Sequence, residues 1–450
     1  MDQLLALPIR GESFLLRRGS RHILVDGGGS LHKISKSGQA LARSLSTVGP
    51  SLRTLDVVVC THADGDHAAG LASLLDHWRV PDGNGGEETG RIGQFWLPGR
   101  WVDVLPELMR TPETFLDGLI AALDQVVHEG PNLAQSDGAD DDLVETLDAM
   151  VRRERRSAMD RELNPEGIHP EPQTYHDLVG DDDVDLGGTE PLDEPGWFSD
   201  LRRDVDGLEG IRPKALKALE SARRRILYRR AQGKIGAALA QFWFGLIDTA
   251  ASIRGIADQA IRHRVRVRWF DFDEFERKRC PRGGVPGFLV PINAVEQAPP
   301  PTSGISYLAQ LSAVNEACLS FFAPPTARRL GVVFCGDSPF GDGQGYANSF
   351  LLSLRSPLLP VVATAPHHGS ESNAMAYGHV ERWANVQVWL RTGGTSKQPG
   401  PTFKQIVFPR RVCTYCPQTN RQPRLAGICG ACSFPSCGPL WITGHHCICP

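Results

Sequence analysis

The chain has 450 residues, of which 41% are hydrophobic and 22% are charged, and its formal net charge is -4. These values are ordinary for a globular protein of one large domain or two to three smaller ones, and they exclude a globally basic nucleic-acid binder but not local basic patches. The first residues lack a basic segment followed by an apolar core, and no stretch is long and apolar enough to span a bilayer. We therefore expect no signal peptide, no membrane association and a cytoplasmic location.

The first hundred residues predict the start of a layered α/β core. Residues 4–26 read as two strands, and they end in Asp-Gly-Gly-Gly-Ser, whose glycines permit a close backbone approach to a ligand but do not have P-loop spacing. A helix over 33–46, a strand over 55–60, a helix over 68–78 and a short strand over 94–98 follow.

The loop at 61–67, Thr-His-Ala-Asp-Gly-Asp-His, holds the densest group of possible metal ligands in the chain. It joins a predicted strand to a predicted helix, and such loops carry function because a rigid scaffold aims them. A helix cap needs only one carboxylate and explains neither histidine. The spacing therefore favours a metal site that includes His62, Asp64, Asp66 and His67.

Residues 102–264 differ in character, because helical patterns dominate at 105–128, 143–161, 213–230 and 236–261. Between them, the acidic and proline-rich stretch 164–196 has the composition of an exposed, poorly ordered segment. We predict four regions: 1–101 as the first half of the core, 102–264 as a mainly helical insertion, 265–408 as the second half of the core, and 409–450 as a cysteine-rich tail.

In the second half of the core, predicted strands again end in loops with polar side chains. Asp337 follows the strand 330–335, and His367 and His368 follow the strand 359–365. In layered α/β folds, loops beyond the strand ends converge on one edge, so these side chains are expected to meet the 61–67 loop. Together they offer enough ligands for two divalent ions, with Asp337 between them and His367 free to protonate a leaving group.

Several motifs, taken in order, resemble the metallo-β-lactamase fold, and specifically the C-terminal domain of the competence protein ComEC, in which an aspartate, here Asp64, stands where most of the superfamily has a second histidine. The resemblance covers roughly residues 5–100 and 266–395 and rests on the segments 11–14, 23–28, 61–67, 315–319, 334–337 and 366–370. It implies an αββα sandwich with a two-metal site at one sheet edge. It also implies the ligand set His62, Asp64, Asp66, His67, Asp337 and His368.

The chain departs from that family in two places. The core has no convincing further histidine between His67 and Asp337, and the segment 394–401 has none after the last strand, although its Lys397 could bind phosphate. The oxygen-rich ligand set leaves Mn²⁺ as suitable as Zn²⁺.

Three arginine-rich clusters, at 152–156, 223–230 and 262–268, are either solvated faces balanced by acids or a track for a phosphate backbone. Only the last cluster leads directly into the core, so Arg264 and Arg266 are the preferred substrate-binding candidates.

The tail contains two Cys-x-x-Cys pairs at close to zinc-ribbon spacing, which predict a structural zinc bound by Cys413, Cys416, Cys429 and Cys432. Further ligand types follow, and they could complete a second site or remain free: Cys437, His445, His446, Cys447 and Cys449. A redox role is the alternative.

The branch that the sequence resembles is associated with nuclease or phosphodiesterase activity, so a metal-dependent nuclease with DNA as the favoured substrate is the first functional hypothesis. Asp66 and His367 are its expected catalytic residues. The alternatives are a hydrolase of a small ester, thioester or lactam, and a non-enzymatic binding module with a vestigial metal site. We also hypothesise that the insertion shields the site until a protease or regulatory protein releases it, as in a latent stress or anti-phage effector.

Overall fold

The structure is a computed structural model of the chain. It describes residues 2–30, 34–83, 85–129, 150–151, 153–154, 194–298, 306–311, 315–326, 329–357, 359–394, 397–416, 423–430, 432–433, 436–437, 441–443 and 446–449. The acidic stretch 164–196, apart from its last three residues, and most of the helix expected at 143–161 lie outside these ranges.

A nine-stranded sheet has the strand order β10-β8-β7-β4-β3-β2-β1-β18-β21. Its central strands β3, β4, β7 and β8 run parallel, while β1, β2, β10, β18 and β21 pair antiparallel. The bounds are β1 Asp2–Ala6, β2 Phe14–Arg18, β3 Arg21–Val25, β4 Thr54–Val59, β7 Arg91–Pro98, β8 Arg266–Asp271, β10 Val295–Glu296, β18 Ala426–Gly430 and β21 Trp441–Thr443. Strands from the tail therefore extend the sheet beyond the N-terminal strand.

A six-stranded sheet has the order β17-β16-β15-β12-β11-β9, in which β12, β15, β16 and β17 run parallel. Its strands are β9 Val290–Pro291, β11 Phe321–Ala323, β12 Gly331–Phe334, β15 Val361–Thr364, β16 Val386–Arg391 and β17 Arg411–Cys413. Three short hairpins complete the strands: β5 Arg79–Pro81 with β6 Glu87–Thr89, β13 Gly341–Asp342 with β14 Asn348–Ser349, and β19 Cys432–Ser433 with β20 Ser436–Cys437.

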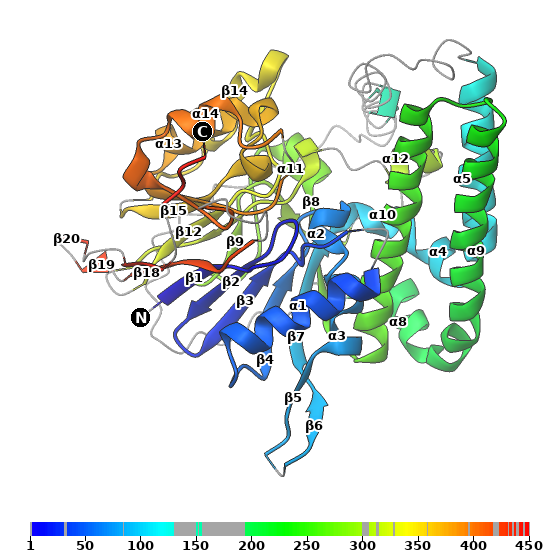
Figure 1. Ribbon diagram of the computed structural model, residues 1–450, viewed down its shortest axis with the longest axis horizontal. Helices are drawn as coiled ribbons and strands as arrows, with labels where there is room; N and C mark the ends of the chain where they lie inside the picture. Colours follow the sequence, from blue (N-terminus) through cyan, green and yellow to red (C-terminus); the bar gives the residue numbers. More distant parts are fainter. Residues whose placement is uncertain are drawn as a thin grey trace.

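The two sheets pack face to face, and helices cover their outer faces (Figure 1). The alternation of β4 shows why: Val57 and Val59 join the core between the sheets, whereas Val58 packs in the core shared with helices. Full burial of each such side chain stabilises the fold by roughly 2 kcal/mol. Helices α1 (Ile34–Val48), α3 (Leu74–His77) and α10 (Ala237–Arg262) belong to the outer core of the nine-stranded sheet, and α11 (Phe272–Lys278) and α13 (Ala374–Trp383) to that of the other sheet.

Between β7 and β8, the described residues form helices that gather at one side of the molecule (Figure 1). They are α4 Leu105–Arg110, α5 Pro112–Glu129, α8 Gly196–Arg203, α9 Val205–Ala231 and α10. The single helix expected over 105–128 is divided, because Pro112 begins α5 at a position where its missing N–H costs nothing. The helix expected from 213 begins earlier, so Pro213 lies inside α9.

The helix expected over 68–78 is also broken, into α2 (Gly65–Ala68), a 3₁₀ turn at Leu71–Ser73 and α3. Two further short helices are α12 (Tyr307–Leu311) and α14 (Pro401–Gln405). Among the described residues, none of the helices combines the length and the apolar character needed to cross a bilayer. The four region boundaries remain predictions.

Candidate metal centre

Polar side chains meet at the edge of the two sheets where the parallel strands have their carboxyl ends. Asp26 follows β3, the 61–67 loop follows β4, and Asp337 follows β12. The two sheets are tied together here, since the Leu319 N–H donates to the Thr61 carbonyl over 3.0 Å. The convergence expected from the sequence is therefore present in the fold.

His62 and His67 are buried and oriented through their Nδ1 atoms. His67 Nδ1 lies 2.8 Å from an oxygen of Asp26, and His62 Nδ1 lies 3.0 Å from the Thr61 hydroxyl. Asp26 is fully buried, and it also accepts hydrogen bonds from the backbone N–H and the hydroxyl of Thr61. The Nε2 atoms of both rings are thus directed into the site, in the way that outer-shell carboxylates orient metal-binding histidines.

His368 is held in the same manner by the loop after β16. Its Nδ1 lies 3.1 Å from the Thr392 carbonyl, and its own carbonyl accepts a 2.6 Å hydrogen bond from Arg391 Nε. The backbone of His367 and His368 has positive φ values of 45° and 55°. Because non-glycine residues seldom adopt this region, the surrounding contacts must impose it, and such strain concentrates at functional sites.

Asp337 lies between the histidines, and its two oxygens face different rings. Oδ1 is 3.3 Å from His67 Nε2, and Oδ2 is 3.6 Å from both His62 Nε2 and His367 Nε2. Nearby imidazoles, His367 and His67 foremost, keep the pKa of Asp337 well below its usual range, although burial acts in the opposite direction. A carboxylate placed in this way can bridge two ions.

Two further carboxylates of the 61–67 loop close the open side of the site. Asp66 Oδ2 lies 2.9 Å from His368 Nε2, and Asp64 Oδ2 lies 3.6 Å from His62 Nε2. Their side chains are 45% and 40% exposed, whereas those of the histidines that they face are 3% and 6% exposed. A substrate would therefore reach the site from the side of Asp64 and Asp66.

Glu12 also belongs to the site, and the sequence analysis had not singled it out as a ligand. It is 1% exposed, and its carboxylate lies in one cluster with His67, Asp337 and His368, whose ligand atoms are all within 4.8 Å of one another. Burial raises the pKa of Glu12 to about 8, although the two histidines oppose the shift. An acidic residue beside a glycine, in the turn between two predicted apolar strands, is the signal that could have identified it.

The residues present fit a pair of divalent ions. Several buried polar atoms here make no hydrogen bond, although His67 Nε2 and His368 Nε2 lie at ion-pair distance from Asp337 and Asp66. These atoms are Glu12 Oε2, His62 Nε2, His67 Nε2, Asp337 Oδ1 and His368 Nε2. Buried polar groups without hydrogen bonds are rare in folded proteins, and bound divalent ions would supply partners for these atoms. Two ligands each about 2.1 Å from one ion lie roughly 3.0–3.4 Å apart, close to the separations found here. The mixture of imidazole and carboxylate suits Zn²⁺ or Mn²⁺.

A second cluster contains only sulfur ligands, and it differs from the set expected in the tail. Four buried thiols have their sulfurs within 4.8 Å of one another: Cys413, Cys416, Cys447 and Cys449. Cys429 instead lies on β18, paired with Gln3 and Trp441. The side chain of Cys432, on β19, lies outside the described part of the chain. The zinc-ribbon spacing identified Cys413 and Cys416 correctly as members of a cluster. Cys447 and Cys449 lie beside them, while Cys429 belongs to β18, which pairs with β1 in the nine-stranded sheet.

The other ligand types in the tail do not join this cluster in the part of the chain that is described. The side chain of Cys437 and all of His445 lie outside that part. His446 lies against the ring of Phe408, with centroids 5.1 Å apart.

The three basic residues expected to bind substrate lie in different places. The backbone pairing sets Arg266 level with Gln94 at the start of β8, so both Arg266 and Arg264 lie toward the edge opposite the metal ligands. Lys397 is exposed, on a loop tied to the His368 loop by a 2.8 Å hydrogen bond from Gly400 N–H to the Gly369 carbonyl. The structure therefore brings Lys397, but not Arg264 and Arg266, to the side of the centre.

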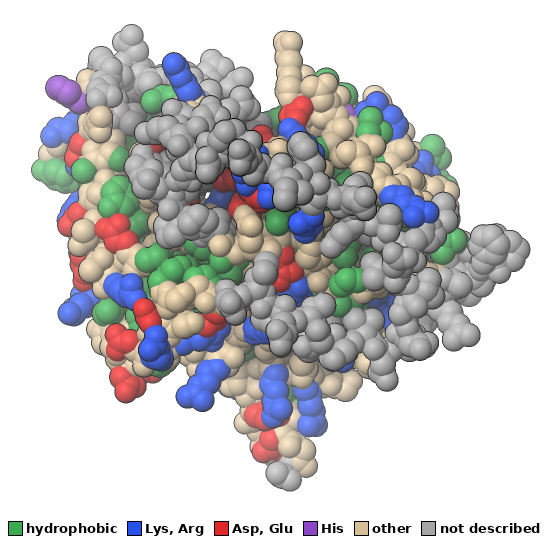
Figure 2. Space-filling model, turned by 180° about the vertical axis from the view of Figure 1, so that it is seen from behind, with side chains coloured by type: hydrophobic (Ala, Val, Ile, Leu, Met, Phe, Trp, Pro, Cys, Tyr) green, Lys and Arg blue, Asp and Glu red, His purple; other side chains and the backbone are tan. Residues whose placement is uncertain are grey.

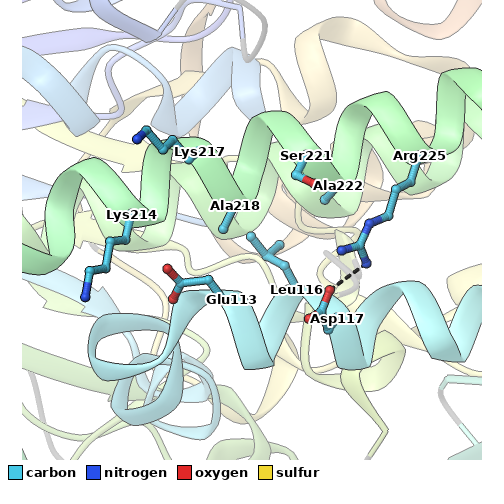
Figure 3. A pocket seen from close by; sticks show the side chains of 9 residues that line it. All are labelled: Glu113, Leu116, Asp117, Lys214, Lys217, Ala218, Ser221, Ala222 and Arg225. Atoms are coloured by element: carbon cyan, nitrogen blue, oxygen red, sulfur yellow. Dashed lines mark hydrogen bonds and ion pairs between the residues drawn. The ribbon is translucent and has the colours of Figure 1, made fainter.

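A separate hollow of about 260 Å³ lies between α5 and α9 (Figure 3). Its lining mixes acidic and basic groups, and an ion pair of Arg225 with Asp117 crosses one end. It contains none of the candidate metal ligands, so we assign the chemistry to the metal centre.

Comparison with known proteins gives one result for the first part of the chain. The model of the metallo-beta-lactamase superfamily matches residues 8–195, a range that contains Glu12, Asp26 and the 61–67 loop but neither Asp337 nor His368. No curated protein matches the chain. A match to this superfamily suggests a metal-dependent hydrolase, and the geometry places the candidate ligands Asp337 and His368 of the second half beside the matched loop.

Proposed function

We propose that the chain is a two-metal phosphodiesterase that hydrolyses nucleic acid, with DNA as the favoured substrate. The observation that carries this proposal is the set of candidate ligands, which contains more carboxylates than a histidine-rich hydrolase centre. Four carboxylates surround three oriented imidazoles: Glu12, Asp64, Asp66 and Asp337. Asp64, at the position where the ComEC-like branch has an aspartate, supports phosphodiester chemistry in particular.

The chain's own groups have distinct tasks in this proposal. When ions are bound, the centre supplies an activated water and stabilisation of the charge that develops on phosphoryl oxygens. His62, His67 and His368 would hold the ions through Nε2, and Asp26 fixes the tautomer of His67 by accepting from its Nδ1.

His367 is the group best placed to protonate the leaving oxygen. It is partly exposed, and its Nε2 faces Asp337 at 3.6 Å. Its Nδ1 lies 3.2 Å from both the Asn373 side-chain oxygen and the Ser372 hydroxyl, which hold the ring in place.

The test is hydrolysis of single-stranded DNA, duplex DNA, RNA and cyclic nucleotides by the full chain, with Zn²⁺ and Mn²⁺ compared. The double substitution Asp66→Ala with His67→Ala should abolish cleavage and lower the content of bound metal. Unchanged cleavage by that variant would reject the proposal.

A second candidate, hydrolysis of a small ester, thioester or lactam, is favoured by the distribution of basic residues. Arg223, Arg225 and Arg229 form ion pairs with acids of α10 and α5, so this cluster is balanced locally. On the face in Figure 2, Lys and Arg side chains are interspersed with Asp and Glu. A panel of small substrates run beside the DNA assays separates the two candidates, whereas a chain that binds fewer than two core metals and cleaves nothing would support a non-enzymatic module.

Latency is a further part of the proposal, and it rests on the composition of residues 164–196. A stress or anti-phage effector of this kind would be inactive when intact and active after limited proteolysis or binding of a regulatory partner. Equal activity of intact and trypsin-clipped protein would contradict this idea.

A further inference from the structure

The four clustered thiols of the tail have the spacing of ligands around one ion. Cys416 Sγ lies 3.4 Å from Cys449 Sγ and 3.8 Å from Cys447 Sγ. Zinc–sulfur bonds of about 2.3 Å in a tetrahedron place sulfurs roughly 3.8 Å apart, whereas a disulfide needs about 2.05 Å. The arrangement therefore matches a closed tetrahedral site.

The surroundings of the four thiols also suit a metal thiolate site. Each of the four cysteines is at most 6% exposed, and burying four thiolates is costly unless a cation compensates their charge. The Ile448 N–H donates to Cys416 Sγ over 3.3 Å, which is an interaction that stabilises a metal-bound thiolate.

The loop of the first two cysteines contacts residues that hold His368. Thr414 is fully buried, and its N–H and hydroxyl contact the Arg391 carbonyl at 3.2 Å and the Thr392 hydroxyl at 3.3 Å. Arg391 and Thr392 are the two residues that hold His368 through its carbonyl and its Nδ1. The guanidinium of Arg391 also lies over the ring of Tyr415, 5.8 Å from its centroid.

Residues remote in sequence thus form one path from the tail to the catalytic site. Cys447 and Cys449 are near the end of the chain, and Cys447 N–H donates to the Arg411 carbonyl over 2.7 Å, at the start of β17. Cys413 ends β17 and pairs with Arg391 of β16. An ion bound by the four thiols would fix these segments relative to one another.

We propose that one structural Zn²⁺ is bound by Cys413, Cys416, Cys447 and Cys449, and that it holds Thr414 against Arg391 and Thr392 and thereby positions His368. The zinc assignment stands without the proposed function, whereas the positioning role rests on it.

The zinc assignment is tested by elemental analysis of the full chain carrying Asp66→Ala and His67→Ala, so that only tail metal is counted. We expect one equivalent of zinc, its loss on adding Cys449→Ser, and its retention in the matched control Cys429→Ser. Zinc retained by the Cys449 variant, iron in place of zinc, or oxidised disulfides in the tail would overturn the assignment.

If Cys449→Ser does not fold, the chain with Cys449 intact still decides the question. Produced with Co²⁺ in place of zinc, it should show the sulfur-to-cobalt charge-transfer absorption of a tetrathiolate site. The absence of that absorption would overturn the assignment.

The positioning role is tested with Thr414→Val, which removes the hydroxyl contact but leaves all four cysteines. This variant should keep its tail zinc, while the Kd of the core centre for Mn²⁺ rises about fivefold, as expected from the loss of one ordinary hydrogen bond. Thr249→Val, a buried threonine of α10, is the matched control. An unchanged Kd would refute the positioning role, and a wild-type chain with tail zinc but no core metal would refute the proposed function instead.

Discussion

Replacing Asp26 with asparagine should weaken metal binding at the core centre without changing the size of the side chain. The Asp26 carboxylate accepts three hydrogen bonds, of 2.8 Å from Thr61 N–H, 2.7 Å from the Thr61 hydroxyl and 2.8 Å from His67 Nδ1. An amide has only one oxygen, so its NH₂ group must face one of these donors. If it faces His67, the ring proton moves to Nε2, the atom that is directed at the metal.

The size of the effect follows from the role of Asp26 as an outer-shell partner. Loss of such a partner lowers metal affinity by about 10- to 100-fold, which corresponds to about 1.4–2.7 kcal/mol. The full outer-shell effect is expected here because Asp26 is 0% exposed, so that no water can replace the lost acceptor.

The assay is a titration of metal-free protein with Mn²⁺ or Zn²⁺ against a competing chelator, with circular dichroism used to show that the variant is folded. Asp56→Asn is the matched control, because Asp56 is also a hydrogen-bonded carboxylate of this sheet but contacts Arg21 and His22 instead. Wild-type affinity in Asp26→Asn, or an equal loss in Asp56→Asn, would refute the assignment of Asp26 as the residue that orients His67.

Three other substitutions test the remaining structural arguments. Glu12→Gln should lower the affinity for core metal by at least about tenfold in the same chelator competition. Glu371→Gln, on the neighbouring loop, is the control and should keep the wild-type affinity. Equal affinities of Glu12→Gln and the wild type would remove Glu12 from the ligand set. Arg268→Met should lower the free energy of unfolding in urea by about 3–5 kcal/mol, because it leaves Glu296 as an unpaired buried charge, whereas Arg21→Met at the surface should cost at most about 1 kcal/mol. Burial raises the pKa of Asp271 to about 6, so between about pH 4 and 6 the folded state holds a proton that the unfolded state has already released. The stability of the wild type should therefore fall relative to that of Asp271→Asn, by at most about 3 kcal/mol, as the pH rises from about 4 to 6. Parallel stability curves for the two proteins would contradict this.

Local sequence patterns determined the loops that carry most of the candidate centre. His62, Asp64, Asp66 and His67 occupy one short segment after a strand, and Asp337 and His368 each follow another strand of apolar residues. Parallel strands place their carboxyl ends at one edge, so strand order alone predicted that these loops would meet. The candidate ligands could be proposed from the sequence because they depend on residue type and on position relative to a strand.

Only the tertiary structure decided which residues complete each site. Glu12 joins the centre because the turn between β1 and β2 is tied to the 61–67 loop. The tie is a 2.6 Å hydrogen bond from the Glu12 N–H to the Asp66 carbonyl. Cys447 replaces Cys429 beside the first cysteine pair because β18 is recruited to the edge of the nine-stranded sheet. Arg266 lies away from the centre because it begins its strand rather than ends it. These outcomes depend on pairings between distant segments, which no local spacing of residues encodes.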